Sequence, residues 1–193
     1  ADIQGAGHIS PLLASASATA PVQNVRGVVT AVASNGFYMQ DPSPDGNPAT
    51  SDGIFVFTNT APGRTVGEAV LVSGTVSEFR AGGNADNLTV TEISNNNAVQ
   101  KLVISPWLDA PSTTIQPIVL GVDRVPPTEV INNDFGSAGG NVETGGDFDP
   151  ANEGIDFYES LEGMLVQINN PIAVSPTVAN GTSEEIWVLA NDG

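Results

Sequence analysis

Glycine and proline interrupt this sequence so often that a long helix has little room to form. The 193 residues include 21 glycines and 14 prolines, and no helix-length stretch repeats its apolar residues at helical spacing. Between these breaks lie short runs rich in β-branched and aromatic residues, which favour strands. Apolar residues make up 40% of the chain, enough for a packed core. We therefore expect a mainly β protein.

Five such runs follow one another between residues 22 and 95. The first two are separated by Ser34-Asn35-Gly36, which is typical of a hairpin turn. Gly27 and Gly74 lie inside the first and fourth runs, where a barrel strand has to bend sharply. The pattern predicts a five-stranded OB-fold-like barrel, with a small sandwich as the alternative. The expected strands are residues 22–33, 36–40, 53–58, 69–79 and 88–93.

The whole sequence divides into four expected regions. Residues 1–21 are an N-terminal lead-in, and residues 22–97 form the OB-fold-like domain. Residues 98–155 are rich in proline and glycine, which predicts an irregular connector. Residues 156–193 are expected to be a partial second OB-like β module, because they resemble the first hairpin in pattern. The similar segments are residues 162–168 with 26–32, and residues 185–192 with 36–41.

The charge of the chain limits what its surface can bind. There are 22 acidic and five basic residues, so the formal net charge is −17. Affinity for nucleic acid rests largely on Lys and Arg, so this balance argues against a surface that clamps phosphates directly. OB-folds also stack bases on outward-facing aromatic residues, about half of which strand alternation would bury. The candidate nucleic-acid-binding residues are Arg26, Phe37, Tyr38 and Phe55.

Several classes of site are excluded by the residues the sequence contains. There is no cysteine, so zinc fingers, disulfides and thiol catalysis are ruled out. No apolar run approaches the roughly 20 residues of a membrane helix, so no membrane partner is expected. The lone histidine, His8, lies in a Gly-rich stretch, and we expect it to bond to backbone in a loop. No nucleophile elbow or phosphate loop occurs. We expect no catalytic residues in this chain.

An acidic loop at residues 41–52 has the spacing of a calcium site. Oxygen-bearing side chains at loop positions 1, 3 and 5, glycine at position 6 and a carboxylate at position 12 follow the order of an EF-hand loop. The flanking segments are strands rather than helices, and the alternative is a turn whose side chains cap its own backbone. The candidate Ca²⁺ ligands here are Asp41, Ser43, Asp45, Asn47 and Asp52.

A second acidic cluster spans residues 147–156. Asp147 and Asp149 are candidate ligands for a hard cation. Residues 156–161 predict a short helix, with Asp156 as its N-cap and Glu159 at the capping-box position.

Several longer stretches resemble a known family. Together they are similar to the region ahead of the catalytic domain in large secreted bacterial nucleases of the endonuclease/exonuclease/phosphatase superfamily. The first module looks like the OB-fold domains of secreted, sugar-nonspecific nucleases. The stretches that carry the resemblance are residues 3–12, 36–42, 45–46, 52–58, 125–130 and 154–164.

The resemblance implies a non-catalytic role for this chain. In such nucleases a downstream domain carries a metal-binding Glu and Gly-Asp-Phe-Asn-like and Ser-Asp-His-like motifs, none of which occurs here. The implied function is a secreted accessory region that helps to bind or position single- or double-stranded DNA or RNA beside a downstream nuclease domain. The divalent cations used by the family support Ca²⁺ in the 41–52 loop. A calcium-stiffened spacer without nucleic-acid affinity is the alternative.

Overall fold

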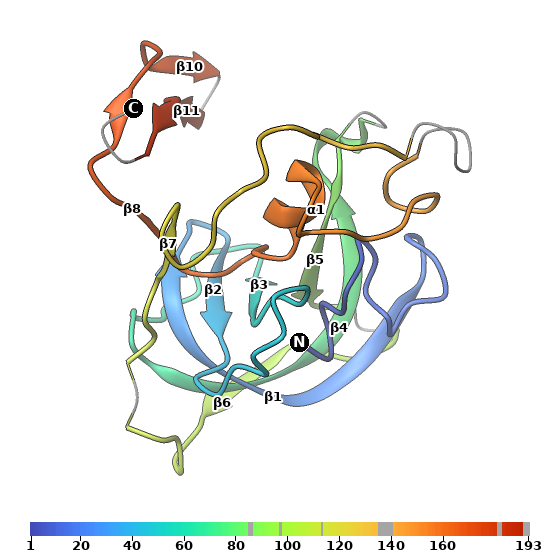
Figure 1. The fold of residues 1–193 in the computed structure, drawn as a ribbon. Coiled ribbons are helices and arrows are strands. Elements are labelled where there is room, and N and C mark those ends of the chain that lie inside the picture. Colours follow the sequence, from blue (N-terminus) through green and yellow to red (C-terminus); the bar gives the residue numbers. More distant parts are fainter. Residues whose placement is uncertain (85–86, 97, 113, 135–140, 181–182, 191–193) are drawn as a thin grey trace. The chain divides into compact units, whose positions relative to one another are not determined.

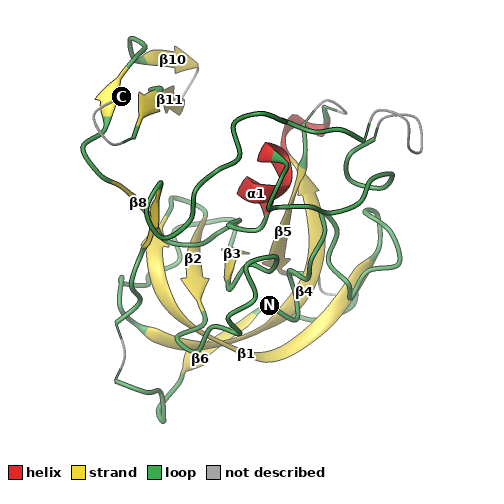
Figure 2. Ribbon diagram, in the orientation of Figure 1, coloured by secondary structure: helices red, strands yellow, loops and turns green. Residues whose placement is uncertain are grey.

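Strands make up most of the regular structure (Figures 1 and 2). The computed structural model describes residues 1–84, 87–96, 98–112, 114–134, 141–180 and 183–190. One short α-helix, α1 (Gly154–Glu159), and one 3₁₀ turn, η1 (Ala81–Gly83), occur in these ranges. The strands are β1 (Thr19–Val32), β2 (Gly36–Gln40), β3 (Gly53–Phe57), β4 (Ala69–Arg80), β5 (Thr89–Ser94), β6 (Val103–Pro106), β7 (Ile118–Leu120), β8 (Val166–Ile168), β9 (Ile172–Ala173), β10 (Val178–Asn180), β11 (Ser183–Glu185) and β12 (Val188–Leu189).

The first five strands close into a barrel, which confirms the predicted fold class. They pair in the order β1-β2-β3-β5-β4, and β4 pairs back with β1. All of these pairings are antiparallel except β3 with β5, which is parallel and involves only two residue pairs. This mixed five-stranded arrangement is OB-like. Because β3 and β5 share so few backbone contacts, closure of the barrel at this junction depends on side-chain contacts.

Two long strands bend to close the barrel. The pairing of β1 with β4 shifts register between Val22 and Val25, and the pairing of β1 with β2 shifts between Val29 and Ala31. Gly74 pairs with Val22 at the first shift, and a Cβ atom there would lie 2.6 Å from Ile93. The register shift and the absence of a side chain at Gly74 allow β4 to pack closely against Ile93 of β5 where the strand bends.

Alternate residues of the strands fill the barrel interior with apolar side chains. Phe37, Val56, Val70, Val76 and Ile93 are all fully buried. The remaining buried members of this core are Leu13, Val29, Met39, Ile54 and Val72. Burial of a Val or Ile side chain contributes on the order of 1.5–3 kcal/mol, so this interior is the main source of stability.

The chain outside the barrel contributes to two compact units. One unit contains residues 1–116 and 127–165, and the other contains residues 117–126 and 166–193. In the first unit, β6 pairs with β4 and extends the line of β5. In the second, β7 pairs in parallel with β8, β9 pairs with β12, and β10 pairs with β11. Within the described residues, the two segments expected to repeat the first hairpin therefore pair with other strands.

Candidate functional site

A lateral row of side chains crosses the outer face of the barrel. Strand register pairs Ala31 with Tyr38, Tyr38 with Phe55, Phe55 with Glu92, and Glu92 with Ser77. Paired residues share one face of a sheet, and the adjacent Val56 and Ile93 belong to the core. The five side chains in this row therefore belong to the outer face of β1-β2-β3-β5-β4.

Two aromatic rings form the centre of this row. The Tyr38 and Phe55 ring centroids are 4.8 Å apart with a tilt of 48°, and Tyr38 is 37% exposed. A Cβ atom on Gly36 would collide with the Phe55 ring, so this ring lies against the glycine backbone. Contact on both sides restricts the rotamers of Phe55. The pair is therefore a preformed aromatic surface on β2 and β3.

The other predicted nucleic-acid-binding residues lie elsewhere. Phe37 is 0% exposed in the core, so its prediction as a stacking residue is wrong, because strand alternation turns it inward. Arg26 lies over the Trp107 ring, with its guanidinium carbon 5.4 Å from the centroid. The geometry is that of a cation–π contact. Tyr38 and Phe55 are thus the predicted residues that the structure brings together.

Positive charge near the barrel is already engaged with acidic side chains. Arg64 pairs with Glu68 at 2.7 Å, and Arg80 pairs with Glu143. These contacts offset two of the five basic residues of the chain. The surface therefore offers few cations to a phosphate backbone.

Residues 162–165 lie against one end of the outer face. Leu165 N donates to Gln40 Oε1 at 3.0 Å, and Ser51 Oγ donates to the carbonyl of Glu162 at 2.6 Å. A Cβ atom on Gly53 would collide with the backbone at Gly163, so the backbones of these two segments are in direct contact, with no side chain between them. Gln40 and Gly53 are register partners next to the aromatic pair. The chain therefore covers this end of the face, while Tyr38 stays exposed.

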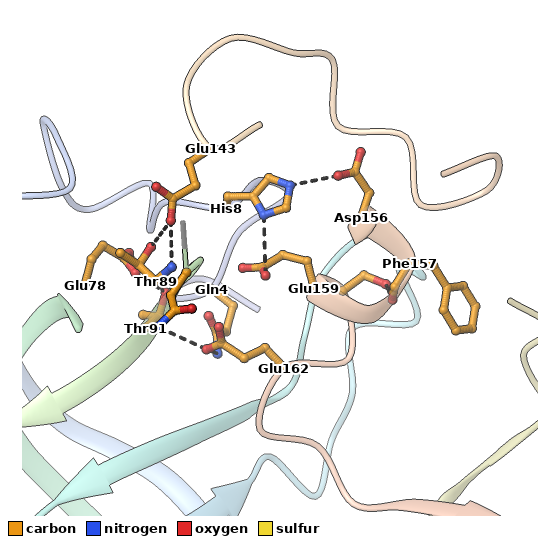
Figure 3. A network of polar contacts seen from close by, with 12 residues as sticks. Gln4, His8, Glu78, Thr89, Thr91, Glu143, Asp156, Phe157, Glu159 and Glu162 are labelled. Atoms are coloured by element: carbon orange, nitrogen blue, oxygen red, sulfur yellow. Dashed lines mark hydrogen bonds and ion pairs between the residues drawn. The ribbon is translucent and has the colours of Figure 1, made fainter. Parts of the chain in front are cut away.

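Two glutamates satisfy the edge of β5 that β3 does not reach (Figure 3). Thr91 N donates to Glu162 Oε1 at 3.0 Å, and Thr89 N donates to Glu143 Oε1 at 2.6 Å. Gln4 Nε2 donates both to Glu162 Oε1 and to the carbonyl of Gly53, each at 3.0 Å. Backbone N–H groups two residues apart point the same way along a strand edge. These side chains thus bridge the short β3–β5 junction and protect the free edge.

The electrostatic states of the edge glutamates differ. Burial, assisted by nearby Glu159, raises the pKa of Glu162 to about 8, so this side chain is largely neutral near pH 7. Burial also acts to raise the pKa of Glu143, but Arg80 and the bonds from Thr89 hold it below its ordinary value. Glu162 therefore accepts its hydrogen bonds mainly as a neutral carboxyl, whereas Glu143 accepts its bonds as a carboxylate beside Arg80.

His8 is held between two carboxylates rather than by backbone. Its Nε2 lies 2.8 Å from Asp156 Oδ1, and its Nδ1 lies 3.4 Å from Glu159 Oε2 (Figure 3). Burial alone would lower the pKa of His8, but Glu159 and Asp156 raise it from 6.5 to about 8. The Phe148 ring packs edge-on at 5.5 Å. The prediction of a backbone-bonded loop histidine is therefore wrong, since the partners lie 148 residues away or more.

The predicted capping role of Asp156 is also wrong. Helix α1 begins at Gly154 with Glu153 as its N-cap, two residues earlier than expected, so Asp156 lies inside the first turn. Its carboxylate instead accepts from Asp149 N at 2.6 Å and contacts His8. Asp149 in turn accepts from Asn152 Nδ2 at 2.7 Å. Asp149 therefore contributes to the local turn, and Asp147 is exposed beside it.

The loop at residues 41–52 bonds mainly to itself. Asp41 Oδ1 accepts from Ser43 N, and Asp45 Oδ1 accepts from Asn47 N, each at 2.8 Å. Asn47 Oδ1 accepts from Ala49 N at 3.0 Å. Asp41 and Asp52 line one cavity of about 390 Å³, together with Arg26. Within the described ranges, no group of three or more acidic or histidine side chains is close enough to hold a metal ion.

Comparison with known proteins adds one match. Residues 119–193 match a family model described as a domain of unknown function (DUF8508), which covers less than half of the chain. No curated protein and no solved structure matched the chain. None of the described helices has the length and apolar character needed to cross a membrane.

Sequence reasoning missed the buried polar cluster because its members are dispersed. Gln4 and His8 lie in the N-terminal segment, whereas Glu78, Glu143 and Glu162 come from three other segments far apart in the sequence. The pattern of β5 gave no signal of it, since Thr89 and Thr91 are buried on the inner face with Ile93, whereas the apolar Val90 between them is exposed. Polar residues on the inner face of a strand need buried partners.

Proposed function

We propose that this chain is a non-catalytic binding module that stacks bases of single-stranded nucleic acid on Tyr38 and Phe55. The observation that carries the proposal is the aromatic pair on β2 and β3 of an OB-like barrel, in which Tyr38 is exposed and Phe55 is half-buried. OB-folds use this face to bind oligonucleotides, and base–aromatic stacking contributes about 1–3 kcal/mol per base. The module would be the accessory region of a larger secreted nuclease that supplies the chemistry.

The net charge of −17 sets the conditions under which such binding occurs. Repulsion between the chain and phosphates weakens encounter, and two of the arginines are paired with glutamates. Divalent cations reduce this repulsion by neutralising carboxylates and phosphates. Binding through Tyr38 and Phe55 therefore increases when Ca²⁺ or Mg²⁺ is present.

The test is a fluorescence-anisotropy titration of a short labelled oligothymidine with the purified chain, in low salt, with and without Ca²⁺. Tyr38→Ala and Phe55→Ala are expected to weaken binding by about tenfold, because each removes a stacking surface. Tyr158→Ala is the matched control, because Tyr158 is also an exposed tyrosine but lies on α1.

Two outcomes contradict the proposal. Equal loss of affinity in Tyr158→Ala and Tyr38→Ala would show that the aromatic pair has no special role. Absence of binding by the wild-type chain in both buffers, at protein concentrations near millimolar, would exclude it as a nucleic-acid-binding module.

A calcium-stiffened spacer is the second candidate. Burial, with a contribution from neighbouring Asp45, raises the pKa of Asp52, as expected where carboxylates crowd together. A bound cation would relieve this repulsion. The prediction is a higher melting temperature in Ca²⁺ than in EDTA, which Asp45→Ala abolishes; identical melting curves in the two buffers would contradict it.

A further inference from the structure

Glu92 is a buried carboxyl that has no partner among the described residues, and it adjoins the aromatic pair. Its side chain is 7% exposed, and register places it beside Phe55 on the outer face. No hydrogen bond or ion pair to its carboxyl comes from any residue that the structure describes. Buried carboxyl groups normally have such partners. Glu92 is therefore a buried acceptor to which no described residue donates a hydrogen bond.

A ligand can reach this carboxyl. The oxygens of Glu92 are not among the described side-chain atoms that are fully enclosed without a hydrogen bond, so they keep some contact with solvent. The neighbours of Glu92 in the row are Phe55 and Ser77, and neither carries a charge. Tyr38, one strand beyond Phe55, is the other titratable side chain of the row. A planar ligand stacked on the rings would therefore present its edge toward Glu92.

The unpartnered carboxyl is costly to the free protein. Burial alone raises the pKa of Glu92 from 4.5 to about 7. A Gln or Thr at this position would avoid that cost, since each is neutral. The carboxyl therefore fits a site that a hydrogen-bond donor completes.

We infer that Glu92 selects the base that stacks on Tyr38 and Phe55, and that it favours guanine. The inference rests on the proposed function. An ionised carboxylate has two acceptor oxygens and no donor. The Watson–Crick edge of guanine carries two adjacent donors, N1–H and N2–H, that match these oxygens in a bidentate pair. The Watson–Crick edges of thymine, cytosine and adenine have no two adjacent donors, so a carboxylate that accepts from their one donor group meets an acceptor beside it and is repelled.

The experiment compares three short oligomers at a pH above the pKa of Glu92 of about 7. One is oligothymidine, the second has a single central guanine, and the third has hypoxanthine in place of that guanine. The guanine oligomer is expected to bind roughly tenfold more tightly than oligothymidine, as for other bidentate base contacts. Hypoxanthine lacks the N2 amino group, so its oligomer is expected to lose most of this gain.

Variants separate the inference from the proposed function. Glu92→Gln is expected to abolish the guanine preference while oligothymidine binding is retained, and Tyr38→Ala is expected to weaken all three oligomers. Equal binding of guanine and thymine oligomers to the wild-type chain, or an unchanged preference in Glu92→Gln, overturns the inference and leaves the stacking surface unaffected. Failure of every oligomer to bind contradicts both.

Discussion

On the inner side and free edge of β5, three glutamates have several partners each, whereas on its outer side Glu92 has none among the described residues. Glu78, Glu143 and Glu162 accept bonds from Thr89, Thr91 and neighbouring segments. Strand β5 thus has a hydrogen-bonded polar cluster on one side, and on the other side it has the carboxyl of Glu92, to which no described residue donates a hydrogen bond. The difference indicates that the first side maintains the fold and that the second is available to a ligand.

The largest expected loss of stability comes from removing one of the glutamates that accept hydrogen bonds on the inner side and free edge of β5. Glu162→Ala leaves Thr91 N–H without its acceptor at the β3–β5 junction and removes one of the two acceptors of the Gln4 amide. Because buried donors without acceptors are costly, we expect a loss of about 2–3 kcal/mol in the free energy of unfolding, measured by urea denaturation.

Glu162→Gln is the matched control for this change. The wild-type carboxyl is largely neutral near pH 7, and an amide oxygen can accept the same bonds. We expect its stability to stay within about 1 kcal/mol of the wild type. An equally large loss in both variants would show that the hydrogen bonds of Glu162 do not hold the junction.

The next effect is a fall in stability as pH rises. Because the pKa of His8 is raised to about 8, its contribution is fully present below 6.5 and disappears as pH rises through 8. We expect this loss to be on the order of 1 kcal/mol after allowance for solvent screening. Urea denaturation at several pH values measures it, with His8→Gln as the variant in which this part of the slope is absent.

Glu162 and Glu92 add to the same slope. Each has a pKa raised by burial, so each lowers stability as pH rises from 4.5 towards about 8 and 7, respectively. His8→Gln should therefore flatten the curve only in part. A wild-type protein that gains stability between pH 6.5 and 8 would contradict the pairing of His8 with its carboxylates and the burial of Glu92 and Glu162.

An effect of similar size and opposite sign is expected at Glu92, on the outer side of β5. Glu92→Gln removes a carboxylate that is costly to ionise, so we expect a gain of about 1 kcal/mol above the pKa of about 7 and little change at acid pH. Melting curves at the two pH values measure it. A loss of stability at alkaline pH would mean that the ionised carboxylate has stabilising partners.

The contrast between the two sides also shows what the sequence could predict. Alternation of Val, Ile and Phe with polar residues is local, so the five strands and the OB-like barrel were predicted correctly. The pairing of His8 with Asp156 was not predicted, since 148 residues separate them and folding alone brings them together. The partner of Thr91 N–H, which lies 71 residues away, was equally hidden.

Phe37 illustrates a different limit. Phe37 and Tyr38 are adjacent aromatic residues, and alternation requires one of them to face inward, but the pattern alone does not say which. The register shift between Val29 and Ala31 changes the alternation in the neighbouring strand. Cross-strand pairing therefore decided which ring belongs to the core.

The central claim, that the outer face of β2, β3 and β5 binds nucleic acid, is tested most directly by NMR. A titration of the isotope-labelled chain with the guanine-containing oligomer in Ca²⁺ should shift the backbone amides of Gly36–Gln40, Gly53–Phe57 and Glu92. The amides of α1 should remain unchanged. Shifts confined to other parts of the chain, or no shifts at saturating oligomer, would contradict the account.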